Sequence, residues 1–170
     1  MSLTTLDIKE PGLNTLPPGV ERYVVEGGGL TGIQILPDDE IKIINNEGNQ
    51  LCEISAFNKD GKSDLAILGL KEIKENSEIK KILFKKDETS LQALLQLKKR
   101  NLNIEKSKSS LIFDKETKAG EIIKLKSKDK CYCIFAAPGE KMMVHEQNPS
   151  TELTVIVKRS VIKKDKENIK

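Results

Sequence analysis

The stretch ERYVVEGGGLTGIQILPDDEIKIINNEGNQLCEISAF, residues 21–57, alternates short apolar runs with tight turns. Glycine, proline, asparagine and aspartate separate the runs, and each favours a turn through its own backbone or side-chain chemistry. This spacing predicts four consecutive β-strands. The predicted strands cover residues 21–26, 30–35, 40–45 and 50–57.

The last of these turns, Asn46-Glu47-Gly48, is predicted to be a hairpin turn between the third and fourth strands. Gly48 would take the positive φ angle that such a tight turn requires. Asn49 and Gln50 are expected to satisfy backbone groups of the loop with their side chains. In the third strand, alternation places Asn45 on the same face as two isoleucines.

From about residue 65 the apolar residues recur three and four positions apart, as they do in amphipathic helices. We therefore expect a helical insertion over about residues 65–108, in which Asp87 or Thr89 caps the second helix. Strand patterns return after the insertion at residues 111–114, 121–125, 131–136 and 152–158.

Strands that flank a helical middle predict a mainly β fold, an antiparallel β-sandwich or closed β-barrel with a helical insertion. A doubly wound α/β sheet is disfavoured, because strands and helices do not alternate along the chain. Residues 1–20 contain three prolines and are expected to form an N-terminal arm. Residues 21–160 are expected to form one domain, and residues 161–170 a charged tail or linker.

The composition excludes several classes of protein. The 170 residues carry 29 basic and 26 acidic side chains, and only three of the basic residues are arginine. We therefore expect no nucleic-acid partner. The chain shows no signal-peptide pattern and no apolar run of membrane-spanning length, so no membrane partner is expected. Three cysteines, an odd number in a chain of this length, argue against a disulfide framework, so we expect a reduced, cytoplasmic protein.

Two groups of side chains are candidates for chemistry. Cys52 is read as a small core residue, while the neighbouring Glu53 points to the opposite face, either to solvent or into a pocket. Cys131 and Cys133 lie on one face of a predicted strand, and two thiolates are a possible start of a metal site. A complete set would also need Cys52 and His145, without the paired close spacings of zinc motifs.

Two blocks of sequence resemble the urea carboxylase-associated domain family, which has no assigned function. They are GGGLTGIQILPDDEIKIINNEGNQLCEISAFNKDG, residues 27–61, and CYCIFAAPGEKM, residues 131–142. The family positions are Asn46-Glu47-Gly48-Asn49-Gln50, Ala56-Phe57 and Ala137-Pro138-Gly139. Some members of the family have further cysteines and histidines for a metal, whereas this chain has one histidine.

More narrowly, the helical middle and the late APGEKM and QNPSTELTV segments resemble the form found N-terminal to glycine cleavage T-protein-like aminomethyltransferases. This resemblance implies an accessory, non-catalytic domain of one-carbon or methylated-amine metabolism. Its partner would be an aminomethyltransferase catalytic domain, in cis or in trans, and tetrahydrofolate would bind to that domain. No cofactor and no catalytic residue is then expected in this chain. A small-molecule pocket is expected to include Asn49, Gln50, Glu53, Phe57 and His145.

Two other functions remain open at this point. One is a stand-alone interaction or scaffold domain, in which no titratable group matters. The other is a small metal-dependent enzyme that uses Glu53, His145 and the three thiols.

Overall fold

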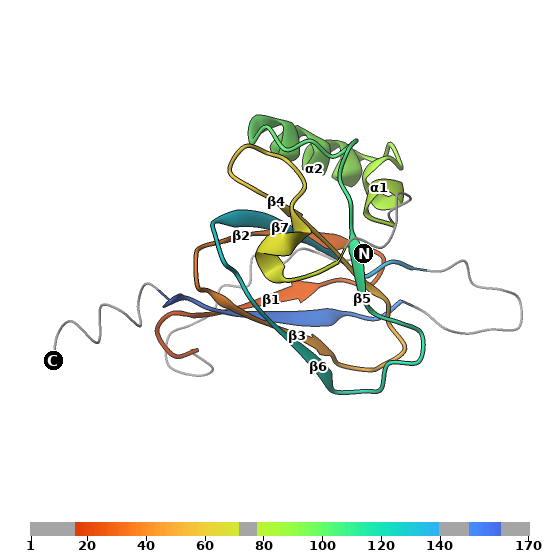
Figure 1. Ribbon diagram of the computed structural model, residues 1–170. Coiled ribbons are helices and arrows are strands. Elements are labelled where there is room, and N and C mark those ends of the chain that lie inside the picture. The colour runs from red at the N-terminus through yellow and green to blue at the C-terminus, as the bar shows by residue number, and fades with distance from the viewer. Residues whose placement is uncertain (1–15, 72–77, 140–149, 161–170) are drawn as a thin grey trace, which may run out of the picture.

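A computed structural model describes residues 16–71, 78–139 and 150–160, and these form two antiparallel four-stranded sheets packed face to face (Figure 1). The predicted mainly β fold with a helical insertion is therefore confirmed, as a sandwich. The first sheet has the order β1 (Val20–Val25), β8 (Leu153–Lys158), β3 (Glu40–Asn45), β6 (Glu121–Lys126). The second has the order β2 (Leu30–Ile35), β7 (Cys131–Ala136), β4 (Cys52–Phe57), β5 (Ser110–Phe113).

This strand order is that of a jelly roll, in which the chain passes repeatedly from one sheet to the other. The predicted hairpin between β3 and β4 is wrong, because β3 pairs with β6 and β8 while β4 pairs with β5 and β7. The same turn residues occur in hairpins and in connections between two sheets. The sequence of the turn therefore does not show which of the two connections is formed. The turn itself is as predicted, since Gly48 has a φ of 78°.

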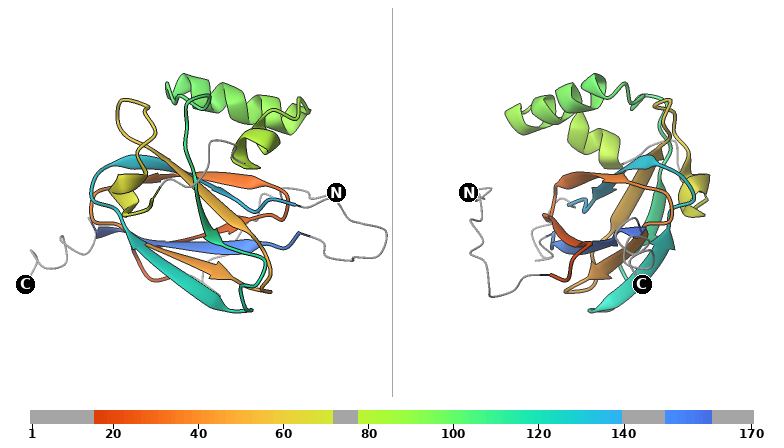
Figure 2. Two further views of the ribbon diagram at one scale, coloured as in Figure 1. Left: turned by 45° about the vertical axis from the view of Figure 1, so that its right-hand side comes forward. Right: turned by 90° about the vertical axis from the view of Figure 1, so that its left-hand side faces the viewer.

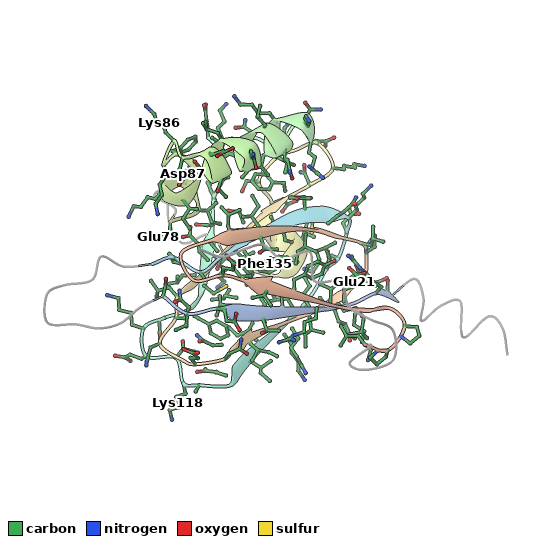
Figure 3. All side chains as sticks on the ribbon, turned by 180° about the vertical axis from the view of Figure 1, so that it is seen from behind. Glu21, Glu78, Lys86, Asp87, Lys118 and Phe135 are labelled. Atoms are coloured by element: carbon green, nitrogen blue, oxygen red, sulfur yellow. The ribbon has the colours of Figure 1, made fainter. Side chains whose placement is uncertain are left out.

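The main core lies between the sheets, where the inward side chains of both interdigitate. On β4 these are Cys52, Ile54 and Ala56, the small apolar face that alternation predicted. Figure 3 shows Phe135 of β7 in this space, and its side chain is fully buried. The short helix η1 (Leu65–Leu68) adds three side chains to the same core.

The helices α1 (Glu78–Leu83) and α2 (Glu88–Lys99) cover the outer face of the second sheet (Figure 2). There Phe57 and Ile134 pack with Ile79 and Leu83 of α1 in a second hydrophobic cluster. This cover explains why every residue of β4 is buried. Asp87 caps α2, as predicted, by accepting a hydrogen bond from the Ser90 amide over 2.7 Å. None of the helices in the described residues is long and apolar enough to cross a membrane.

One end of the sandwich is held by Arg159, which follows β8. Its guanidinium donates to the Glu21 carboxylate at 2.8 Å and to Asp39 Oδ2 at 2.7 Å. Asp39 is fully buried and also accepts from the backbone amides of Leu36 and Ser160. These contacts join β1, β8 and the turn between β2 and β3. The predicted tail at 161–170 and most of the predicted arm lie outside the described residues.

Candidate functional site

Gln50 joins three segments at the opposite end of the sandwich. Its side-chain amide nitrogen donates to the carbonyl groups of Leu51 and Pro138, each over 2.9 Å. Its side-chain oxygen accepts a hydrogen bond from the Thr151 amide over 2.8 Å. Gln50 therefore satisfies backbone groups, as expected, and holds the end of β7 and the start of β8 against the turn that precedes β4.

The three consecutive glycines, residues 27–29, lie at the same end of the sandwich as Gln50. The Gly28 amide donates to the carbonyl of Ala137, and the Ala137 amide donates to the carbonyl of Gly29. A side chain at Gly27 would come within 2.4 Å of the Ser150 carbonyl oxygen, so the backbones touch at a point where only glycine fits. We call this meeting of residues 27–29, 45–50, 137–139 and 150–151 the Gln50 junction.

Asn45, which was not among the predicted site residues, is also a member of the junction. Its side chain accepts from the Gly48 amide at 3.0 Å and donates to the Gln50 carbonyl at 2.8 Å, which closes the turn from inside. Asn45 is fully buried. The signal was present in the sequence, because alternation put this polar residue on the core face beside Ile41 and Ile43.

The chemistry of the junction is that of neutral hydrogen-bonding groups. The described groups that contact the Gln50 side chain are backbone carbonyls and a backbone amide. Beside them the hydroxyl of Thr151 is buried and has no hydrogen-bond partner among the described residues. Such a hydroxyl is costly to leave unpaired and is therefore a place where a polar ligand atom or a water can bind.

Glu53 lies elsewhere, on the face of β4 that is turned toward the helices. It is 4% exposed, and its carboxylate accepts hydrogen bonds from the Glu78 amide, over 2.7 Å, and from the Ser109 hydroxyl. The carboxylate thus satisfies an amide at the start of α1, where the helix has no acceptor of its own. Figure 3 shows Glu78 on the helical side of the second sheet.

The remaining predicted ligand-binding residues do not join Gln50 or Glu53 in one site among the described residues. Phe57 is fully buried in the cluster beneath α1. Asn49 is exposed at the turn with a φ of 57°, and its backbone amide donates to the Thr117 carbonyl. His145 lies outside the described residues. Ligand binding by these residues stays a prediction, with Gln50 and Glu53 in separate environments.

The structure places two of the three thiols side by side. The sulfur atoms of Cys131 and Cys133 are 3.6 Å apart and face the core. Cys133 lies opposite Ala56, four residues along β4 from Cys52, which corresponds to about 13 Å along the strand. Among the described residues no three cysteine, histidine or acidic side chains are grouped closely enough to hold a metal ion.

Burial and hydrogen bonding shift the pKa values of the three thiols in different directions or by different causes. Burial raises the pKa of Cys52 far above its ordinary value, with the neighbouring Glu53 charge as a further cause. The hydrogen bond from Cys133 lowers the pKa of Cys131, because a thiolate at 131 is the better acceptor. The same bond, together with burial, raises the pKa of Cys133.

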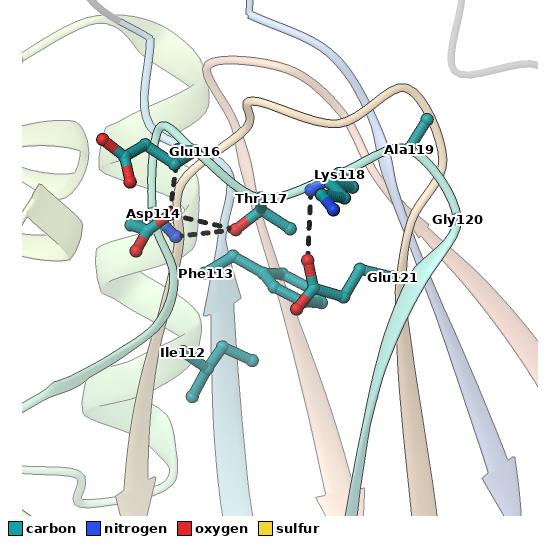
Figure 4. Close-up of a pocket in the computed structure, with 9 residues that line it drawn as sticks. All are labelled: Ile112, Phe113, Asp114, Glu116, Thr117, Lys118, Ala119, Gly120 and Glu121. Carbon is teal, nitrogen blue, oxygen red and sulfur yellow. Dashed lines mark hydrogen bonds between the residues drawn. The ribbon is translucent and has the colours of Figure 1, made fainter.

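A hollow of about 640 Å³ lies in the loop between β5 and β6 (Figure 4). Several of the polar groups that line it are hydrogen-bonded to one another: Thr117 with Asp114, the Glu116 amide with Asp114, and the Lys118 amide with Glu121. These pairs organise the loop against which the Gly48 turn packs. Polar groups that are already paired are less available to a ligand, so the Gln50 junction is the better candidate for a site.

This chain is similar over most of its length to part of a larger enzyme. It is 34% identical over 157 residues to a trimethylamine-oxide aldolase of Ruegeria pomeroyi, a match that includes 92% of the chain. The chain spans about a fifth of that relative, 20% of its length. No family model matches the chain, so the resemblance to the urea carboxylase-associated domain family stays a prediction.

Proposed function

We propose that this chain is an accessory, non-catalytic domain of an enzyme of methylated-amine metabolism, and that it binds a small methylated amine oxide at the Gln50 junction. The observation that carries the proposal is the similarity to the trimethylamine-oxide aldolase, which extends over nearly all of this chain. That match uses only 20% of the relative, so most of the relative lies outside it.

The contacts of the junction support the ligand-binding half of the proposal. Three motif segments that are far apart in the sequence converge there, through the Gln50 bonds and the close approach of Gly27 to Ser150. The Thr151 hydroxyl, which has no hydrogen-bond partner among the described residues, is a donor suited to the oxygen of an amine oxide. A site of neutral donors and acceptors orients such a ligand without a general acid or base.

The partner we propose is an aminomethyltransferase-type domain, joined to this domain in cis or bound in trans. Tetrahydrofolate would bind to that domain and would supply the one-carbon acceptor chemistry. The proposal for partner and cofactor rests on the resemblance of the helical middle and of the late APG segment. The role of this chain is then to present or retain the amine oxide beside the transferase.

The proposal is tested by adding trimethylamine oxide to the isotopically labelled protein and following the backbone amide signals. We expect saturable shifts at Gly28, Gln50 and Thr151, and no consumption of trimethylamine oxide by the chain alone. Tert-butanol, a neutral molecule of the same shape, controls for effects of the solvent. Thr151→Val should abolish the shifts, and Thr89→Val, at an exposed position on α2, should leave them unchanged.

Two results would overturn the proposal. Consumption of trimethylamine oxide by this chain alone would show a catalytic rather than an accessory role. Shifts that rise linearly with concentration, or that are equal for tert-butanol, would show that the junction is not a methylated-amine site.

A further inference from the structure

The outer face of the first sheet carries its side chains in rows that run across the strands. The register places Arg22, Ile156, Lys42 and Lys124 in one row, which we call the basic row. The next row toward the Gln50 junction, the apolar row, contains Val24, Thr154, Ile44 and Ile122. Continued alternation beyond the strands gives an acidic row with Glu26, Glu152 and Asn46.

The basic end of this face has an excess of positive charge. The basic row and the row beyond it hold Arg22, Lys42, Lys124, Lys126 and Lys158 against the single carboxylate of Glu40. The resulting local charge of +4 exceeds the +3 of the whole chain. All four lysines of this set line one hollow of about 600 Å³.

Two of the lysines are placed unfavourably for the isolated chain. Lys42 and Lys124 lie directly opposite each other on neighbouring strands, and like charges in such pairs destabilise a sheet. No salt bridge to either is found within the described residues. A counter-charge from outside these residues would remove the repulsion.

The apolar row presents hydrophobic surface on this side of the molecule. Val24 is 40% exposed and Ile122 is 44% exposed. The helices lie on the opposite side, over the second sheet, and no described helix or strand covers this face (Figures 1 and 2). These two exposed side chains lie on the edge strands β1 and β6, whereas Thr154 on β8 is 2% exposed and accepts a hydrogen bond from the Asn46 side chain. A sheet face that no helix covers and that carries exposed apolar residues can serve as an interface.

We propose that this face binds the same face of a second copy of the chain, with the strands of the two copies antiparallel. A twofold axis along the apolar row would place Val24, Ile44 and Ile122 each against the same residue of the other copy. The same axis would bring the acidic row of one copy onto the basic row of the other, with Glu152 between Arg22 and Lys42. An axis along the strands is disfavoured, because it would place the two basic rows against each other.

The order of the rows favours a second copy over an acidic partner protein. An acidic partner would need only the basic end, whereas here basic, apolar and acidic rows follow one another in the order that a twofold axis requires. Three overlapping rows across four strands measure about 20 by 20 Å, or roughly 800 Å² over both copies. An interface of this size is small, so the dimer should be weak and in exchange with the monomer.

The proposal is tested by sedimentation velocity of the 170-residue protein at concentrations up to about 1 mM. A reversible monomer–dimer equilibrium is expected, and added salt should weaken it because the charged rows are screened. Ile122→Asp should abolish the dimer. Leu95→Asp should leave the dimer intact, because Leu95 is 58% exposed but lies on α2, far from this face.

A charge exchange tests the antiparallel arrangement itself. Lys42→Glu and Glu152→Lys should each weaken the dimer at least tenfold, and the double variant should recover most of the loss. A monomer at all concentrations would overturn the proposal. It would also be overturned by a dimer that persists in Ile122→Asp, or by one that Lys42→Glu weakens but Glu152→Lys does not. None of these outcomes depends on binding at the Gln50 junction, so the two proposals stand or fall separately.

Discussion

The side-chain amide of Gln50 donates to the backbone carbonyl of Pro138 over 2.9 Å, across 88 positions of sequence. This bond connects the two blocks of sequence on which the family resemblance rests. Because Gln50 also holds the Thr151 amide, one side chain fixes the ends of two strands that lie in different sheets. The proposed site therefore depends on the fold being complete.

Gln50→Glu should destabilise the protein by about 2–3 kcal/mol, because two donated hydrogen bonds are lost and a carboxylate then faces two carbonyl oxygens. The measurement is urea unfolding near neutral pH. Gln92→Glu makes the same chemical change at an exposed position of α2 and should have almost no effect. Equal stability of the two variants would contradict the role assigned to Gln50.

Glu53→Leu should cost about 2–4 kcal/mol, because it leaves the partly buried Glu78 amide and the buried Ser109 hydroxyl without their acceptor. Glu53→Gln should cost less, since its carbonyl oxygen can still accept one of these bonds. Hydrogen exchange is expected to accelerate mainly in α1. If α1 keeps its protection in Glu53→Leu, the carboxylate does not anchor the helix, and a ligand-binding role for Glu53 gains support.

Local patterns predicted the strands, the faces of the residues in β3, in β4 and around Cys131 and Cys133, and the cap of α2, because these depend on neighbours in sequence. Alternation placed Cys52 and Glu53 on opposite faces of β4, and the structure agrees. The partners of each face depend on distant segments, as in the pairing of β1 with β8. Consequently, the sequence did not show that α1 covers Glu53.

The same limit explains the wrong hairpin and the incomplete site. The turn at Gly48 has the chemistry of a hairpin, but strand pairing is set by the whole sandwich. Gln50 was found through the turn and the family motif, whereas its partners Pro138 and Thr151 lie in segments next to β7 and β8. Alternation predicted that Asn45 lies on the core face. Its hydrogen bonds to the Gly48 amide and the Gln50 carbonyl are known only from the structure.

Glu21→Gln should lower stability most near neutral pH and very little in acid. The hydrogen bonds from Arg159 hold the pKa of Glu21 below its ordinary value of 4.5, despite partial burial. A lowered folded-state pKa gives stability that is present above the unfolded pKa and is lost as the pH falls through the folded pKa. The side chain is 38% exposed, so the effect should be below about 1 kcal/mol.

This effect is checked by urea unfolding of wild type and Glu21→Gln at several pH values. The difference between them should be greatest above pH 4.5 and should shrink below it. Glu116→Gln removes a negative charge from the exposed loop between β5 and β6 and serves as the control. A difference that grows in acid would show that Arg159 does not stabilise the ionised form of Glu21.

Alkylation should distinguish the three thiols in the folded protein. All three cysteines are buried, and burial raises the pKa of Cys52, so Cys52 should react only when the protein unfolds. Cys131 should react before Cys133, because the hydrogen bond from Cys133 lowers its pKa while the pKa of Cys133 is raised. Mass spectrometry after iodoacetamide treatment, with and without urea, measures the order. Rapid alkylation of Cys52 without urea would mean that the core around β4 is open to solvent, and the packing described for the sandwich would then be wrong there.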